Sequence, residues 1–158
     1  MHPPDELTAM FRTRGLKITP QRQAVFRALH RADGHPSAEA VHAAVSAEMP
    51  SVSLRTVYQV LHDLTSMGEL AALDLGTGST RFDPTTAEHH HVVCTRCGAI
   101  RDIYLRAVDI EVPPEQAGGF TVAGRPEITF RGLCARCAGA DAAEPPDPPR
   151  NQRKASNG

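Results

Sequence analysis

Two Cys-x-x-Cys pairs are the most specific chemical feature of the sequence. Cys94 and Cys97 form one pair, and Cys134 and Cys137 form the other. A Cys-x-x-Cys turn lets two thiolates bind one ion, and two such turns complete a tetrahedral zinc site. Because four protein ligands leave no coordination position open, we expect the zinc to be structural. A redox dithiol or an iron–sulfur cluster is the alternative, and the absence of a spare cysteine favours zinc.

A second group of possible metal ligands surrounds the first cysteine pair. In a β-strand alternate residues share a face, so His89 and His91 would point one way and His90 the other. The carboxylates of Asp83 and Asp102 flank this stretch. Imidazole combined with carboxylate suits Fe(II), Mn(II), Ni(II) or Zn(II), which indicates a second metal site. A surface cluster of histidines and acids without a metal is the alternative.

Four amphipathic segments and two strand-like runs precede these motifs. The helices are expected over residues 5–14, from Pro20 after a capping Thr19, from Ala38 after Ser37, and over Leu54–Met67 after Ser53. The strands are expected over Leu70–Leu75 and Ser79–Phe82, with a glycine-containing turn between them. Helices followed by a hairpin are the order of the winged helix-turn-helix, in which the last helix would be the recognition helix and the hairpin the wing.

The fourth predicted helix carries polar side chains outside its buried stripe, namely Arg55, Thr56, Tyr58 and Gln59. Arginine can fork onto guanine and glutamine onto adenine, while tyrosine can touch a thymine methyl or a phosphate. Phosphate contacts could also come from Lys17, Arg14 and Arg22. An ordinary amphipathic helix with a solvated outer face is the alternative interpretation.

The second half of the chain has a different pattern. Residues 84–88 have the composition of a hinge between a domain over 1–83 and a domain over 89–137. Strands are expected over His89–Val93, Ala99–Tyr104, Phe120–Ala123 and Ile128–Leu133, and a short helix could begin at Leu105–Asp109. Residues 138–158 are rich in proline and polar, so we expect a disordered tail. The predicted fold class is therefore α+β.

Composition limits the possible functions. The 158 residues carry a formal net charge of −1, which argues against binding nucleic acid by bulk charge but allows a local basic face. No stretch approaches the roughly 18 apolar residues of a membrane span, and the N-terminus lacks the regions of a signal peptide. We therefore expect a cytoplasmic protein. Aromatic residues are only 4% of the chain, so its hydrophobic cores contain few large side chains. Small cores of this kind favour stabilisation by a bound metal or by dimerisation.

Over residues 5–137 the sequence resembles the ferric-uptake-regulator (Fur) family of metal-dependent bacterial repressors. The resemblance rests on Gly15–Arg22, His35–Glu39, Ser53–Tyr58, Arg81–Asp83, the His-x-His-x-x-Cys that ends at Cys94, and the two cysteine pairs. It implies a homodimer that binds a palindromic DNA operator. Each chain would have an N-terminal winged helix and a C-terminal α/β dimerisation domain.

The resemblance also implies two sets of metal ligands. The cysteines match the structural Zn(II) ligands. The regulatory Fe(II) or Mn(II) ligands of the peroxide-sensing, PerR-like branch match His35, Asp83, His89, His91 and Asp102. His35, from its local sequence alone, would be a structural residue of an inter-helix turn. Hydrogen peroxide would inactivate such a repressor by iron-catalysed oxidation of His35 or His89.

Single positions favour that branch over others. Position 102 is Asp, where many iron-uptake regulators carry Glu, and position 87 is Ala, where nickel-responsive relatives place a further His. The most similar-looking members are actinobacterial regulators of a catalase-peroxidase. A repressor that responds to the dose of iron, manganese or nickel without sensing peroxide is the alternative within the family.

An enzyme is the alternative outside the family. His89, His91 and one carboxylate could form the facial triad of a non-haem iron oxygenase. Such an enzyme needs a substrate pocket, and the helical N-terminal half would then have no role. We therefore expect a regulator rather than an enzyme.

Overall fold

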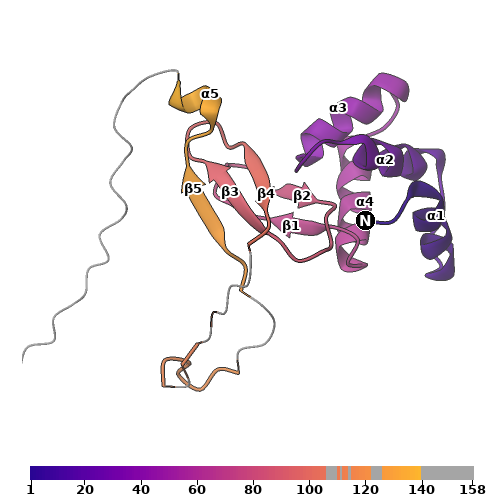
Figure 1. The fold of residues 1–158 in the computed structure, drawn as a ribbon. Coiled ribbons are helices and arrows are strands. Elements are labelled where there is room, and N and C mark those ends of the chain that lie inside the picture. The colour runs from indigo at the N-terminus through magenta and orange to yellow at the C-terminus, as the bar shows by residue number, and fades with distance from the viewer. Residues whose placement is uncertain (106–109, 111, 114, 122–125, 140–158) are drawn as a thin grey trace, which may run out of the picture.

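The computed structural model describes residues 1–105, 110, 112–113, 115–121 and 126–139. Its elements form a group of helices at one end, a three-stranded sheet at the other and a hairpin between them (Figure 1). The described helices include none that is both long and apolar enough to cross a membrane.

Four helices make up the N-terminal half: α1 (Pro4–Thr13), α2 (Pro20–Arg31), α3 (Ala38–Glu48) and α4 (Leu54–Ser66). The caps predicted for the last three are confirmed. Thr19, Ser37 and Ser53 accept the backbone N–H groups of the residues three positions further on. Such a cap satisfies one of the otherwise unpaired N–H groups of the first turn, so these helices begin where the sequence indicates.

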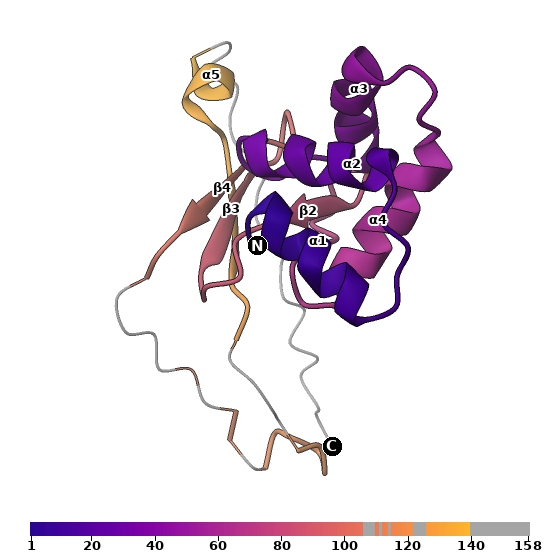
Figure 2. The ribbon, with the colours of Figure 1, turned by 90° about the vertical axis from the view of Figure 1, so that its right-hand side faces the viewer.

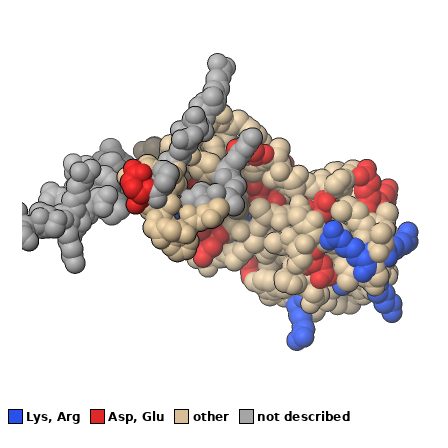
Figure 3. Space-filling model, turned by 90° about the horizontal axis from the view of Figure 1, so that it is seen from below, with Lys and Arg blue, Asp and Glu red and all other residues tan. Residues whose placement is uncertain are grey.

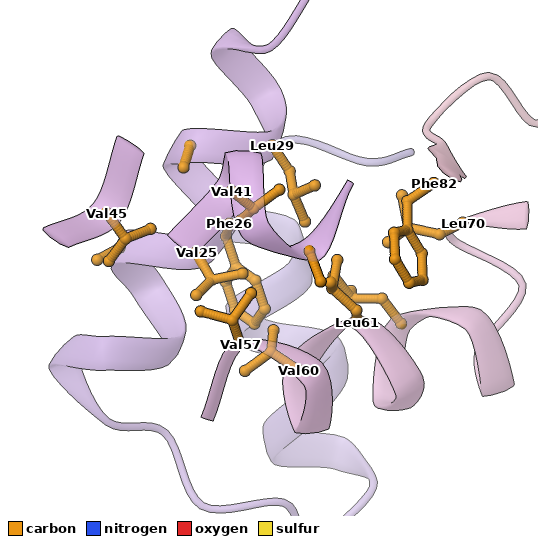
Figure 4. Close-up of a cluster of buried hydrophobic side chains, with 14 of the residues drawn as sticks. Val25, Phe26, Leu29, Val41, Val45, Val57, Val60, Leu61, Leu70 and Phe82 are labelled. Carbon is orange, nitrogen blue, oxygen red and sulfur yellow. The ribbon is translucent and has the colours of Figure 1, made fainter. Parts of the chain in front are cut away.

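The helices enclose one apolar core. Phe11 and Phe26 meet edge to face with their ring centroids 4.9 Å apart, and Val57 and Leu61 of α4 are fully buried. Figure 4 shows that Phe82 lies against the same cluster, although it comes from the hairpin. Burying one such side chain contributes about 1.5–3 kcal/mol. The hairpin is therefore held to the helices by side-chain packing as well as by its covalent connection to α4.

The hairpin pairs β1 (Ala71–Leu73) with β2 (Arg81–Asp83) in antiparallel register. Both strands are shorter than predicted, and β2 extends to Asp83. The connection contains Gly76 and Gly78 at φ +69° and +85°, a left-handed backbone that interrupts strand geometry. Phe82 of β2 packs in the helical core, so the hairpin lies against the helical group, and Figure 2 shows α1 and α2 on the near side of β2.

The C-terminal half contains a sheet in the order β4-β3-β5. Its strands are β3 (His90–Cys94), β4 (Ile100–Ile103) and β5 (Thr129–Gly132), with β3 antiparallel to β4 and parallel to β5. A short helix, α5 (Ala135–Ala138), follows, and it includes Ala138, which was expected to begin the tail.

Several predictions for this half fall wholly or partly outside the described residues. Phe120 and Thr121 are not in a strand, contrary to the prediction, and Val122 and Ala123 lie outside the described part. Leu105 is not helical, and residues 106–109 are not described. The predicted tail beyond Gly139 is likewise not described.

The hairpin also packs on the C-terminal sheet. Leu73 and Leu75, from the hairpin and its loop, form an apolar cluster with Val93 and Ile100. The guanidinium of Arg131 donates to the Leu75 carbonyl at 3.0 Å. The hairpin thus contacts the helices on one side and the sheet on the other.

Candidate metal centres

A histidine and carboxylate cluster lies between the helical half and the sheet. One ligand atom from each of His35, Asp83, His89 and His91 lies within 4.8 Å of all the others. The four side chains are 1–5% exposed. His35 comes from the loop between α2 and α3, and Asp83 from the end of β2. His89 immediately precedes β3, and His91 lies within it.

Backbone pairing explains why these distant residues meet. The N–H of Phe82 donates to the carbonyl of Pro36 at 3.0 Å, and Ser37 forms an isolated bridge with Arg81. These contacts hold the His35 loop beside β2 and therefore beside Asp83. Sequence patterning indicated that His35 lies in a turn, but no local pattern indicated this pairing.

Sheet register adds Asp102 to the cluster. His91 and Asp102 are directly opposite each other on β3 and β4, and such partners place their side chains on the same face. Asp102 Oδ1 lies 2.9 Å from His35 Nε2 and 3.8 Å from His89 Nε2. Its side chain is 25% exposed, so it lies at the edge of the tighter group of four.

Asp83 is at the centre of the group. Its Oδ2 lies 2.8 Å from His89 Nε2, 3.3 Å from His91 Nε2 and 3.7 Å from His35 Nε2. The Nε2 atoms of His89 and His91 are 3.0 Å apart. Three imidazole nitrogens therefore converge on one carboxylate oxygen, which is the donor set that suits divalent transition metals.

Unpaired buried atoms test whether these residues fit an ion. Both ring nitrogens of His35 and Oδ1 of Asp102 are buried without a hydrogen-bond partner, despite the short distance between His35 Nε2 and Asp102 Oδ1. Buried polar atoms are almost always satisfied. His35 Nε2 and Asp102 Oδ1 lie close together in the cluster without hydrogen-bonding to each other, and a coordinated cation would satisfy both, so the residues fit a metal.

Outer contacts orient the ligands. His89 Nδ1 lies 2.8 Å from the Ala87 carbonyl; donation there leaves Nε2 with its lone pair toward the cluster, as in metal-ligating histidines generally. The Thr85 N–H donates to Asp83 Oδ1 at 2.7 Å. Thr85 and Ala87 belong to the predicted hinge over residues 84–88, and the Asp-x-Thr pattern of Asp83 and Thr85 favours such a turn.

The electrostatics favour positive charge in the cluster. Burial would raise the pKa of Asp83, but the His35 imidazole and the Thr85 N–H hold it well below its ordinary range. Burial would lower the pKa of His89, but the Ala87 carbonyl and the two carboxylates raise it. The carboxylate at the centre is therefore anionic and attracts a cation.

His90 does not belong to the cluster. It is opposite Ile103 in the sheet, is buried, and its Nδ1 accepts the Ile128 N–H at 3.4 Å. The predicted alternation of the three histidines is thus observed, and His90 has a packing role.

The four cysteines form the second cluster, with all four Sγ atoms within 4.8 Å of one another. Cys94 ends β3 and Cys97 lies in the following turn, while Cys134 is the N-cap of α5 and Cys137 lies within that helix. None of them forms a disulfide.

Glycine allows the turn of the first pair. Gly98 has φ +68° and donates its N–H to the Cys94 carbonyl at 2.9 Å. A Cβ at this position would lie 3.3 Å from Cβ of Thr77, which is tighter than ordinary contact. The turn therefore requires glycine both for its backbone conformation and for its approach to the hairpin.

The thiols titrate over a wide range. The backbone N–H groups of Cys134 and Cys97 lower the pKa of Cys94 to about 6. Hydrogen bonding with the Cys134 and Cys97 sulfurs raises the pKa of Cys137 to about 12. The Cys94 thiol therefore loses its proton readily, whereas the Cys137 thiol resists losing its own beside the other sulfurs. This chemistry fits a metal bound by all four.

The predicted DNA-contacting side chains lie on and around α4. Arg55, Gln59 and Lys17 are exposed, Thr56 is half-buried, and Tyr58 is 46% exposed. Two of them have side-chain partners: Tyr58 donates to Glu39 Oε1 at 2.8 Å, and Gln59 donates to Asp63 Oδ1 at 2.9 Å.

Arg22 has a structural role instead of a free phosphate-binding position. Its guanidinium donates to Asp63 Oδ2 at 2.9 Å and to the Lys17 carbonyl at 2.9 Å. On the face seen in Figure 3, Lys and Arg side chains gather at the helical end of the molecule. Asp and Glu side chains lie among them on the same face.

Comparisons with known proteins agree on one family. The matching family model is the ferric uptake regulator family, over residues 13–122. The peroxide-responsive repressor PerR of Staphylococcus epidermidis is 34% identical over 137 residues, which are 86% of this chain and 91% of the relative.

Two solved structures show the same fold. The ferric uptake regulator Fur of Helicobacter pylori has a TM-score of 0.65 at 21% identity, over 84% of this chain and 89% of that one. PerR from Streptococcus pyogenes has a TM-score of 0.50 at 26% identity, over 87% and 94%. By the extent of the family match and the identity to the staphylococcal relative, the chain belongs to the ferric uptake regulator family.

Proposed function

We propose that the protein is a metal-dependent transcriptional repressor that binds palindromic operator DNA as a homodimer. One observation carries the proposal: buried ligands from the helical half and from the sheet converge on one carboxylate. A cation bound there would join the two halves. As a repressor it would act in the cytoplasm.

The two centres have separate roles in this proposal. Cys94, Cys97, Cys134 and Cys137 would hold a structural Zn(II) that ties α5 to the turn after β3. His35, Asp83, His89, His91 and Asp102 would hold regulatory Fe(II) or Mn(II). The H. pylori relative is described as having three functional metal-binding sites, which supports more than one metal in the family.

Metal binding would select one arrangement of the two halves. His35 and Asp83 are attached to the helical group, while His89, His91 and Asp102 belong to the sheet. An ion that binds all of them is bound best when the halves are close, so it shifts the population toward that state. In a dimer this would fix two α4 helices at the spacing of successive major grooves.

Peroxide sensing is the finer part of the proposal. Fe(II) held by His35, Asp83, His89, His91 and Asp102 would supply the reducing equivalents for hydrogen peroxide, and this chemistry would end in oxidation of one of the ligands. His35 and His89 would be the oxidised residues, and loss of a ligand would release the metal. A cavity of about 360 Å³ lined by Asp83, His89 and His91 offers space for a small molecule beside the site. PerR from S. pyogenes is described as a protein of peroxide sensing and gene regulation.

Selection from a random duplex pool tests the repressor proposal. The zinc-loaded protein is incubated with the pool alone or with Fe(II), Mn(II), Zn(II) or Ni(II), and bound duplexes are sequenced. We expect enrichment of a palindrome with Fe(II) or Mn(II) and none without added metal. Equal enrichment without added metal would contradict metal dependence.

Mass spectrometry tests the peroxide chemistry. After a brief exposure to a low concentration of hydrogen peroxide, the iron-loaded protein should gain the mass of one oxygen on a peptide that contains His35 or His89. The manganese-loaded protein, treated in parallel, should not. An unmodified iron-loaded protein would exclude oxidation as the signal.

A repressor that responds only to metal dose is the second candidate, and the position of Asp102 favours it. Asp102 is more exposed than the other ligands and lies outside the group of four, so those four could bind metal without it. Replacing Asp102 with Glu and measuring peroxide sensitivity separates the candidates. A facial-triad enzyme is not proposed, because the family consists of regulators.

A further inference from the structure

The hydroxyl of Tyr58 is engaged by the preceding helix. It donates to Glu39 Oε1 at 2.8 Å, from α4 across to the first turn of α3. Tyr58 is nevertheless 46% exposed and Glu39 is exposed. The ring therefore faces solvent on the recognition helix while its only hydroxyl proton is directed to a carboxylate.

Glu39 is anchored and ionised. The hydrogen bond from Tyr58, then its own backbone N–H and the Ser37 hydroxyl, together with the charge of Arg81, lower the pKa of Glu39. Its place in the first turn of α3 also favours negative charge. The hydrogen bond to Glu39 in turn raises the pKa of Tyr58. At neutral pH the carboxylate accepts and the phenol donates.

This arrangement limits what Tyr58 can offer to DNA. A phenol has one proton to donate, and Glu39 already accepts it. Phosphate oxygens are acceptors only, so the hydroxyl has no proton left for them. The Glu39 charge beside it would also repel a phosphate. The remaining contacts are those of the ring with a thymine methyl, or of the oxygen lone pairs with a base amino group.

We propose that Glu39 is a positioning residue that holds the Tyr58 hydroxyl away from the DNA backbone and makes Tyr58 a reader of base edges. The inference rests on the proposed DNA-binding function and adds a specificity-determining residue from α3 to it. Glu39 would lower affinity for DNA in general, because it adds negative charge, and raise the preference for the correct sequence.

The contact can be measured in the protein alone. The chain has two tyrosines, so the difference in tyrosinate absorbance between wild type and Tyr58→Phe isolates the titration of Tyr58. Glu39→Gln and Glu39→Ala should each lower the pKa of Tyr58 toward its ordinary value. An unchanged titration in both variants would overturn the contact, whatever the protein does with DNA.

The consequence is measured with the palindromic duplex selected by the metal-loaded wild type and a scrambled duplex of the same composition. Glu39→Gln removes the charge but keeps an oxygen that can accept the hydroxyl. It should tighten binding to both duplexes alike and keep their ratio. Glu39→Ala frees the hydroxyl for phosphate, so the ratio should fall about fivefold or more, the scale of one misread base pair.

Two variants of Tyr58 separate the contribution of its ring to DNA affinity from that of its hydroxyl. Tyr58→Phe should change affinity less than about threefold, whereas Tyr58→Ala should lose about tenfold or more, on the scale of one base contact. With deoxyuridine in place of thymine in the selected duplex, wild type should lose affinity and Tyr58→Ala should not. Circular dichroism confirms that each variant folds.

The outcomes separate the two proposals. A Tyr58→Phe loss equal to that of Tyr58→Ala would show that the hydroxyl contacts the DNA and would overturn the inference alone. So would an unchanged duplex ratio in Glu39→Ala. If the metal-loaded wild type selects no duplex, the repressor proposal fails and this inference fails with it.

Discussion

Asp83 is a carboxylate with a side chain only 1% exposed, surrounded by the imidazoles of His35, His89 and His91. A buried charge is costly unless it is paired, and here the pairing groups are all good metal ligands. His90, between two of these histidines in sequence, faces the other side of the sheet. Adjacent histidines therefore lie on opposite faces of the sheet, because side chains alternate along a strand.

Exchanging single histidines tests this assignment. His91→Ala removes a ligand and should weaken Mn(II) binding at least about 100-fold, because even outer partners of a metal ligand contribute 10–100-fold. The matched control is His90→Gln, which keeps an acceptor for Ile128 and should leave Mn(II) binding unchanged. Isothermal titration of the zinc-loaded proteins measures both. Equal losses in the two variants would contradict the assignment.

Replacing one cysteine of the cluster should remove zinc and lower the stability of the fold. Cys137→Ser should reduce bound zinc from one per chain toward none. The free energy of unfolding should fall by about 3 kcal/mol or more, which lowers the melting temperature by about 10 °C. Thr95→Ala, within the first Cys-x-x-Cys turn, is the control and should keep its zinc. Elemental analysis and thermal unfolding give the two values; a variant that melts like wild type would exclude a structural zinc.

At the scale of elements, the parts that local chemistry determines could be predicted. Thr19, Ser37 and Ser53 marked three helix starts, and the apolar stripe marked α4. Strand alternation separated His90 from its neighbours. Local sequence patterns did not predict that His35 lies close to Asp83, because this proximity depends on the backbone hydrogen bond from Phe82 to the Pro36 carbonyl. The ligand set came from family resemblance.

The contact between hairpin and sheet was also not predicted, since it joins residues far apart in sequence. Leu75, 6% exposed, packs with Val93, and its carbonyl accepts from Arg131. This contact joins the two halves through residues other than the candidate metal ligands. The predicted hinge over residues 84–88 therefore has a second connection beside it, through the hairpin.

Leu75→Ala tests the effect of that contact. Loss of a buried leucine side chain should cost about 2–3 kcal/mol of stability. It should also weaken Mn(II) binding about fivefold or more, because the ion must then bring the halves together alone. Leu54→Ala, at a half-exposed leucine of α4, is the control for stability and metal affinity. Unaltered Mn(II) affinity in Leu75→Ala would mean that the hairpin does not assist closure.

At the scale of the whole molecule, the sheet half exposes apolar side chains that the helical half does not cover. Tyr104 is 67%, Phe120 83% and Phe130 45% exposed. Exposed aromatic side chains of this kind are typical of protein interfaces. A second copy of the chain covering this surface agrees with the proposed homodimer, in which the sheet halves associate and the helical halves hold DNA.

Phe130→Glu tests that arrangement. A charge in the centre of an apolar interface should raise the dimer dissociation constant about tenfold or more, measured by sedimentation equilibrium. Ala43→Glu, exposed on α3, is the matched control and should remain dimeric. Affinity for the selected duplex should also fall in Phe130→Glu. A fully dimeric Phe130→Glu protein would place the interface elsewhere.

In the proposed function, one regulatory ion bound across the two halves controls DNA binding. Fluorescence anisotropy with the selected duplex tests it directly, using one zinc-loaded preparation with and without Mn(II) beside the His91→Ala variant. Wild type should bind at least about tenfold more tightly with Mn(II), within the usual range of coupling between sites, and His91→Ala should show no such gain. Equal affinities of wild type with and without Mn(II) would contradict the account.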